Sequence, residues 1–244
     1  MNSRWFHVSG NTSEIGQEIR GCFRIIRLIV RKDLLAEMRT RSSFPQMAAF
    51  AILLLVIINI TLQTGVVVQE IVPGILWIIL IFAGTLGLNH SMTLEHEHDC
   101  LQGLRTCPVP RYTLYLGKMI GNFLMMILLE LILWPGAMIL FNLPPGWFLL
   151  PLTGVFGLTT LGFTSIGTLF AMMSANARMR EVMLPMLLFP IILPLLLAAV
   201  KSTGKILAQK PWTEIQFELQ FFVVFDIVFL GLALLLSEYI LENE

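Results

Sequence analysis

The chain has too few charged residues for a protein that folds in water. Only 13% of its 244 residues are Asp, Glu, Lys or Arg, whereas a soluble domain carries about 25%. Hydrophobic residues make up 56% of the chain, and the mean hydropathy is +0.80. The formal net charge is zero, so the charge balance does not indicate a nucleic-acid partner. The composition excludes a water-soluble domain and favours lipid as the surrounding solvent.

Cysteine is scarce, and an early apolar segment is missing. The chain has only Cys22, Cys100 and Cys107, and an odd count argues against a disulfide framework. The first 40 residues are polar and basic, without the apolar core and small-residue cleavage site of a signal peptide. We therefore expect reduced thiols and no cleaved leader.

Motifs that carry catalysis are absent as well. The sequence contains no Gly-x-x-x-x-Gly-Lys-Ser/Thr phosphate-binding loop. It also lacks His-Glu-x-x-His, a nucleophile elbow and a Cys/His catalytic pattern. We expect no catalytic residues and no directly bound cofactor. Any energy for active transport must then come from another subunit.

Long apolar segments are what the sequence does contain. Six of them lie near the ~20 residues needed to span a bilayer. They run from Met47 to Thr64, Gly74 to Met92, Met119 to Phe141, Trp147 to Ser174, Val182 to Val200 and Phe217 to Leu236. The prediction is an all-α polytopic membrane protein with six transmembrane helices. The fourth segment is rich in Gly and Thr, which favours close packing within the bundle or between protomers.

Lys and Arg are distributed unequally between the two sides. Eight precede Met47, three lie in residues 93–118 and two follow the fourth segment, whereas the other loops hold three. The positive-inside rule then places both termini in the cytoplasm of a bacterial inner-membrane protein. We divide the chain into a cytoplasmic tail, residues 1–46, and a permease domain, residues 47–244. The second contains a cytoplasmic loop at 93–118.

The tail contains a helical pattern of apolar residues. They recur at spacings of three and four: Ile19, Phe23, Ile26, Val30, Leu34 and Met38. Arginines follow the same rhythm beside them. This pattern predicts an amphipathic helix in the headgroup plane, with its apolar face toward membrane lipids. It fits a fixed anchor and a moving elbow helix equally well.

The loop at 93–118 predicts a second short helix, from about Leu94 to Thr106. Glu95 and Glu97 stand near its start and Arg105 near its end, which suits the helix dipole. Its apolar edge consists of Leu94, Leu101 and Leu104. Such a helix can dock into a partner's groove, and a solvated helix without a partner is the alternative.

Possible metal ligands gather in the same loop. They are His96, His98, Cys100 and Cys107. The residue types suit zinc, but the spacing matches no standard zinc pattern. On a helix His96 and Cys100 share a face and His98 does not. We expect structural or surface roles for them, and no metal site.

Several short motifs around this loop resemble one family. They are Pro73-Gly-Ile-Leu-Trp77, Leu94-Glu95, Glu97, Leu101, Gly103-Leu104, Pro108, Leu116-Gly-Lys118 and Gly121-Asn122. Their order and spacing resemble the haem exporter protein B family, CcmB, from about Ile25 to Leu197. The residues before Phe23 are unusual for that family.

The resemblance implies a fold, partners and a cargo. CcmB-like proteins are permease subunits of an ABC-type complex for cytochrome c maturation, with an ABC-2-type exporter-like bundle. They pair with the ATPase CcmA and associate with CcmC and CcmD, and the complex is associated with delivering haem to the periplasmic chaperone CcmE. The resemblance fits both a bundle that carries haem itself and one that only transmits ATP energy for loading or releasing the chaperone. By analogy the ATPase-coupling residues are Leu94, Glu95, Glu97, Leu101, Gly103, Leu104 and Arg105. A homodimer, ATP use by the partner and haem as cargo are implied in the same way.

Three polar residues fall inside the predicted spans, where polar groups are costly. We place Glu130, Asp226 and Asn59 near mid-depth. They form either a polar site along a translocation path or hydrogen bonds between helices. His90, at a cytoplasmic span end, is a candidate haem contact, with a hydrogen-bonding cap as its alternative.

Other functions remain open at the level of sequence. One is a permease of another ABC-2-type exporter with a different cargo. Another is a non-transporting haem-handling membrane scaffold. A membrane-embedded enzyme or haem chaperone acting alone would need converging ligands or catalytic groups, and the sequence offers only scattered candidates.

Overall fold

A computed structural model describes residues 12–40, 43–62, 68–97, 111–142, 149–174 and 180–243. Apart from one short 3-10 turn, η1 (Trp212–Glu214), the regular elements in these ranges are α-helices. They are α1 (Thr12–Thr40), α2 (Ser43–Thr61), α3 (Val68–Glu97), α5 (Arg111–Leu140), α6 (Leu149–Ser174), α7 (Arg180–Leu207) and α8 (Gln216–Asn243). Six of them, α2 to α8, are long and apolar enough to cross a membrane. The predicted all-α fold with six spans is confirmed.

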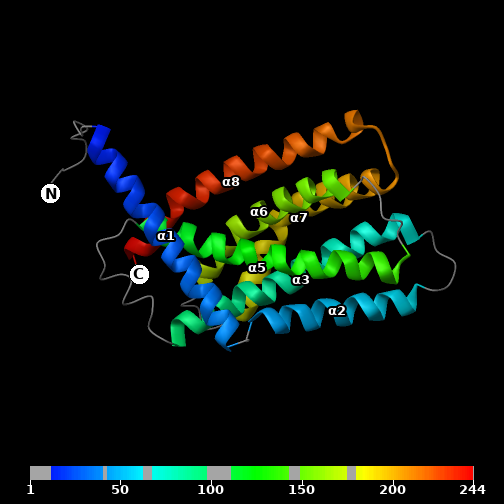
Figure 1. Ribbon diagram of the computed structural model, residues 1–244, viewed down its shortest axis with the longest axis horizontal. Helices are drawn as coiled ribbons and strands as arrows, with labels where there is room; N and C mark the ends of the chain where they lie inside the picture. Colours follow the sequence, from blue (N-terminus) through cyan, green and yellow to red (C-terminus); the bar gives the residue numbers. More distant parts are fainter. Residues whose placement is uncertain are drawn as a thin grey trace.

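Helices α6 and α3 form the middle of the bundle. In the structure, 78% of the α6 span and 67% of the α3 span is buried, against 17–28% for the other four spans. The spans run along the long axis of the molecule, and α1 crosses one end obliquely (Figure 1). Large apolar side chains such as Ile139 and Leu235 are exposed on the outer helices, as expected for surfaces that face lipid.

Small residues allow the inner helices to pack closely. Lipid supplies no hydrophobic drive between helices, so association depends on van der Waals contact and hydrogen bonds. A Cβ at Gly84 of α3 would lie 2.7 Å from a Phe163 ring carbon and 2.8 Å from the Met126 sulfur. At Gly87 a Cβ would collide with the side chain of Met47. These glycines therefore make room for methionines of α5 and α2.

The aromatic residue of the predicted motif at 73–77 joins α3 to α7. The indole N–H of Trp77 donates to the hydroxyl of Thr203 at 3.0 Å. The same ring stacks on Phe156 of α6, with centroids 4.7 Å apart. Trp77 is 2% exposed, so its polar edge is satisfied although the ring is buried.

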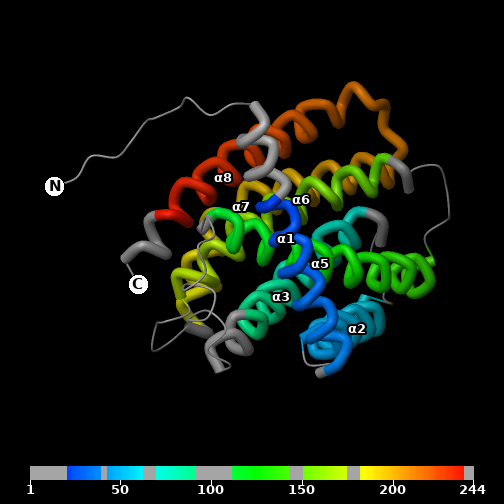
Figure 2. Tube along the Cα trace, turned by 60° about the vertical axis from the view of Figure 1, so that its left-hand side comes forward, coloured from blue at the N-terminus to red at the C-terminus, as the bar shows by residue number. Residues whose placement is uncertain are grey.

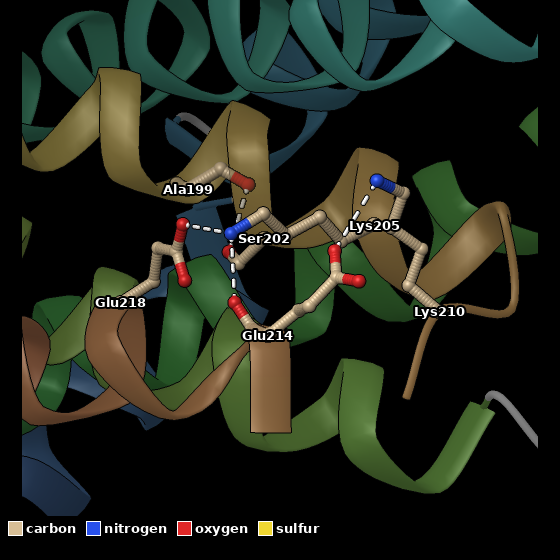
Figure 3. A network of polar contacts seen from close by, with 6 residues as sticks. All are labelled: Ala199, Ser202, Lys205, Lys210, Glu214 and Glu218. Atoms are coloured by element: carbon tan, nitrogen blue, oxygen red, sulfur yellow. Dashed lines mark hydrogen bonds and ion pairs between the residues drawn. The ribbon is translucent and has the colours of Figure 1, made fainter. Parts of the chain in front are cut away.

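The connection between α7 and α8 is a tightly bonded turn. Gln209 has a φ of 52°, and the Lys210 N–H donates to the Lys205 carbonyl, as in a left-handed helix cap. The ammonium of Lys205 contacts the Glu218 carboxylate at 2.5 Å and donates to the Glu214 carbonyl at 2.7 Å. Figure 3 shows this network linking the end of α7, η1 and the start of α8.

The predicted N-terminal helix exists as α1, but part of its packing was not foreseen. Ile29 is buried against Gly117 of α5, whereas Phe23 and Met38 of the predicted apolar stripe are each 75% exposed. The packed face lies roughly a quarter-turn from the stripe, given 3.6 residues per turn. Helix α1 packs against α5 (Figure 2). This contact, rather than hydrophobicity alone, decides which face of α1 is buried.

Candidate functional site

A cavity of about 290 Å³ lies where α1 meets α2, α3 and α5. Its charged lining consists of Lys32, Asp33, Glu37 and Lys118. Its other lining residues are Leu34, Ala36, Ser43, Met47, Gly84, Gly87, Leu88, Ser91, Gly121, Asn122, Met125 and Met126. Apolar walls with a few polar groups are typical of ligand sites. We therefore take this junction, the elbow cavity, as the candidate site.

The sequence of α5 explains why α1 docks here. Gly117 and Gly121 are four residues apart and share one helix face. A Cβ at Gly117 would lie 2.9 Å from Ile29, and one at Gly121 would lie 3.6 Å from an Asp33 oxygen. Gly117 leaves the room that Ile29 of α1 occupies, and Gly121 faces Asp33 at ordinary contact distance. Lys118, next to Gly117, is thereby brought to the carboxylate of Asp33.

An ion pair closes this contact. The Lys118 ammonium lies 2.9 Å from one oxygen of Asp33, and their side chains are 8% and 18% exposed. The Lys32 ammonium lies 3.2 Å from the other oxygen and is 46% exposed. Both carboxylate oxygens therefore face a cation, which offsets much of the cost of removing the charges from water.

A second carboxylate of α1 holds the start of α2. Glu37 is 9% exposed, and its Oε1 accepts a hydrogen bond of 2.6 Å from the backbone N–H of Phe44. First-turn N–H groups have no partner within their own helix, and a negative charge is favourable there. Asp33 and Glu37, one turn apart on α1, thus bind α5 and α2 respectively.

Among the described residues, three side-chain hydrogen bonds join α5 to α6, one of them from Asn122 of the cavity lining. Tyr115 donates to the Ser165 carbonyl at 2.9 Å. Asn122 donates to the Thr168 hydroxyl at 2.9 Å. Further along, the Thr160 hydroxyl donates to Glu130. The Gly- and Thr-rich segment is thus a packing seam within the bundle, and Glu130 makes a hydrogen bond between helices.

Asp226 lies in a different environment from Glu130. Its carboxylate is so close to Gly162 of α6 that a Cβ there would lie 2.6 Å from Oδ1 and 3.1 Å from Leu195. Asp226 is 6% exposed, and neither oxygen has a hydrogen-bond partner among the described residues. Glu130 and Asp226 contact different residues of α6, so neither contact brings the two carboxyls together.

The expected depth of Asn59 is wrong. Its side-chain amide donates to the Leu140 carbonyl at 2.7 Å, and Leu140 is the last residue of α5. Asn59 also lies in the last turn of α2. Leu140 follows Glu130 by ten residues, or about 15 Å of helix. Asn59 therefore ties two helix ends together and does not share the level of Glu130.

The other predicted site residues are only partly placed. Leu94, Glu95 and Glu97 belong to the end of α3, so no separate helix begins at Leu94. Leu101, Gly103, Leu104 and Arg105 lie outside the described residues. The predicted loop at 93–118 is also shorter, since α5 begins at Arg111. Helices α3 and α5 extend beyond their most apolar portions, so each continues into the predicted loop at 93–118.

Histidines and cysteines do not form a metal site in the part of the chain that is described. His98, Cys100 and Cys107 lie outside it. His90 does not line the elbow cavity, and its Nε2 is buried without a hydrogen-bond partner among the described atoms. Its role as a haem contact stays a prediction.

Sequence reasoning did not single out Asp33 and Glu37 as site residues, although they carry the contacts of α1. They stand four residues apart on a helix otherwise rich in arginine. Two carboxylates on one face of a basic amphipathic helix were the available signal. Their partners could not be inferred, because those partners depend on how α1 packs.

Comparison with known proteins places these residues in a family. A family model described as CcmB protein matches residues 24–237. The chain belongs to the CcmB family. The match extends beyond the predicted limit of Leu197 through most of the sixth span. All residues that line the elbow cavity fall inside the CcmB match, whereas the first 23 residues lie outside it.

One relative gives an independent comparison with the CcmB-family chain. Heme exporter protein B of Rhodobacter capsulatus is 24% identical over 174 residues. The alignment covers 70% of this chain and 79% of the relative. The predicted family is thus confirmed by a family model and by a named relative.

We predict that replacing Lys118 by Met destabilises the protein, because Asp33 loses the more deeply buried of its two cations. The expected loss is about 3 kcal/mol in the free energy of unfolding, measured by SDS titration in detergent micelles. Lys32→Met is the matched control. Its side chain is 46% exposed, so we expect a loss below about 1 kcal/mol. Equal losses would contradict the assigned role of Lys118.

We predict opposite effects for the two buried acids. Glu130→Leu should lower the free energy of unfolding by about 1–3 kcal/mol, because the Thr160 hydroxyl loses its acceptor. Asp226→Leu should leave stability unchanged or raise it, because its oxygens have no partner among the described residues. Glu130→Gln keeps an acceptor oxygen and serves as the control. The same SDS titration distinguishes them, and equal losses for both leucine variants would refute the distinction.

Proposed function

We propose that this chain is the membrane subunit of an ATP-driven ABC-type complex that exports or delivers haem for c-type cytochrome biogenesis. Membership of the CcmB family carries this proposal, together with six helices suited to span a membrane. The name of the Rhodobacter relative supports haem as the cargo. ATP is hydrolysed by a separate subunit, because the sequence has no phosphate-binding loop.

The lengths of α3 and α5 support a coupling role for the segment between them. Each helix has 30 residues and is therefore about 45 Å long, whereas the hydrocarbon core is about 30 Å thick. Lys118 of α5 contacts α1, so the long ends emerge where α1 crosses the bundle (Figure 1). We propose that Leu94, Glu95, Glu97, Leu101, Gly103, Leu104 and Arg105 dock on the ATPase.

The contacts of α1 supply a route from that segment into the bundle. Lys118 lies seven residues after the start of α5 and is paired with Asp33. Glu37, one turn further along α1, bonds the start of α2. A displacement of the segment before α5 would therefore move α1 and α2 with it. In this proposal α1 is an elbow that moves with the bundle rather than a fixed anchor.

The partners and the location follow from the same family. We propose a homodimer that works with a CcmA-like ATPase and with CcmC- and CcmD-like subunits in the bacterial inner membrane. Both termini are cytoplasmic, in line with the thirteen basic residues on that side. A permease with another cargo and a non-transporting haem-handling scaffold are the alternatives. If cytochrome c maturation depends on ATP and requires the coupling residues, this result supports the proposal against both alternatives.

The proposed orientation can be tested with native thiols. In a Cys22→Ser variant, Cys100 and Cys107 are the remaining cysteines. We predict that a membrane-impermeant maleimide labels them in inverted vesicles but not in spheroplasts. Gln209→Cys in a chain without native cysteines is the control, because Gln209 is exposed at the other end of the bundle. Labelling of Cys100 or Cys107 in spheroplasts would show that this loop faces the periplasm, so that the proposed topology is inverted.

The proposed coupling can be tested by co-purification from membranes. We predict that wild-type protein recovers an ABC ATPase, identified by mass spectrometry. The double variant Leu101→Asp and Leu104→Asp should lose it, because charge on the apolar edge prevents docking. Cytochrome c maturation should fail in the same cells. Gln102→Asp, in the same segment, is expected to retain both. Full maturation with the double variant would favour a scaffold.

A further inference from the structure

The elbow cavity extends from charged groups to apolar ones. Two cations and two carboxylates stand at the α1 side, and the rest of the lining is mostly apolar, with Ser43, Ser91 and Asn122 as its uncharged polar residues. The four formal charges sum to zero, so the lining favours neither an anion nor a cation. An amphiphile with one positive and one negative group on its head would complement it.

The depth of the elbow cavity in the bilayer also favours an amphiphile as its ligand. Lys118 and Leu140 are 22 residues apart on α5, or about 33 Å by the helical rise. This separation is close to the ~30 Å thickness of the hydrocarbon core, so Lys118 lies at headgroup level. Met125 and Met126 follow by seven and eight residues, about 11 Å deeper. The cavity thus begins among headgroups and ends among acyl chains.

The glycines that line the elbow cavity have different surroundings. The space beside Gly84 and Gly87 is filled by Met126 and Met47. At Gly121, by contrast, a Cβ would meet only Asp33, at 3.6 and 3.9 Å, which is ordinary van der Waals contact. A side chain there would occupy the charged end of the cavity without a backbone collision. Gly121 is therefore the position from which the cavity can be filled.

We propose that the elbow cavity binds the headgroup and upper acyl chain of one zwitterionic phospholipid that carries a primary ammonium, as phosphatidylethanolamine does. The phosphate lies beside Lys32 and Lys118, and the ammonium donates to Asp33 or Glu37. One acyl chain follows Met125 and Met126. A choline headgroup has no N–H to donate, and phosphatidylglycerol has no ammonium for the carboxylates. At about 290 Å³ the cavity holds part of the lipid rather than all of it.

The bound lipid would be part of the elbow. It would touch α1, α2, α3 and α5 at once, since all four line the cavity. The lipid would then fill the angle between α1 and the spans. This inference does not depend on the cargo or on the ATPase.

Native mass spectrometry of the full-length chain tests the proposal. The protein is released from detergent micelles that contain phosphatidylethanolamine, phosphatidylcholine or phosphatidylglycerol, each alone and in equal mixture. We expect one retained phosphatidylethanolamine per chain, bound at least about tenfold more tightly than the other two. Gly121→Leu should abolish this binding. Gly231→Leu on α8 is the matched control, because nothing lies within 4 Å of a Cβ there.

A second variant covers the case in which Gly121→Leu does not fold. Gly121→Ala adds one methyl at ordinary contact distance and should weaken binding by about tenfold. Equal retention of all three lipids, or phosphatidylethanolamine binding unchanged by Gly121→Ala, would overturn the proposal. Haemin that displaces the lipid from the wild type, and that does not bind Gly121→Leu, would show a cargo pocket instead.

Discussion

The paired charges of Asp33 and Lys118 connect the helix that crosses the end of the bundle to the spans. Neither charge is stable alone at a largely buried position, and each is tolerated because the other is within 2.9 Å. The contact requires Gly117, where a Cβ would lie 2.9 Å from Ile29 and would keep α1 away from α5. The elbow cavity, the bond from Glu37 to α2 and the position of α1 all depend on this contact.

Within the spans, cohesion has a different source. Thr160, Thr164 and Thr168 of α6 make hydrogen bonds to α5 or to their own backbone, and the glycines of α3 admit methionines from neighbouring helices. In lipid such contacts replace the hydrophobic effect that would drive a soluble bundle together. This explains why the most buried span is the one richest in Gly and Thr rather than in Leu.

The sequence was sufficient to predict the six spans and the family, because long apolar segments and ordered motifs are local features. The sequence was less informative about the position of each residue along its span. The predicted first span began at Met47, but α2 begins at Ser43, since Pro45 is tolerated in a first turn. Because α2 also ends at Thr61 rather than at the predicted Thr64, Asn59 lies in its last turn. The pairing of Asp33 with Lys118 could not be predicted, because 85 positions separate them and only helix packing brings them together.

The bonded turn between α7 and α8 has a mechanical consequence. Lys205 holds the first turn of α8 through Glu218 and η1 through the Glu214 carbonyl, so the two helices cannot separate at that end without breaking both contacts. Helices α7 and α8 therefore form a hairpin that moves as one unit. Any gate at that membrane surface must therefore open along a boundary other than the one between α7 and α8.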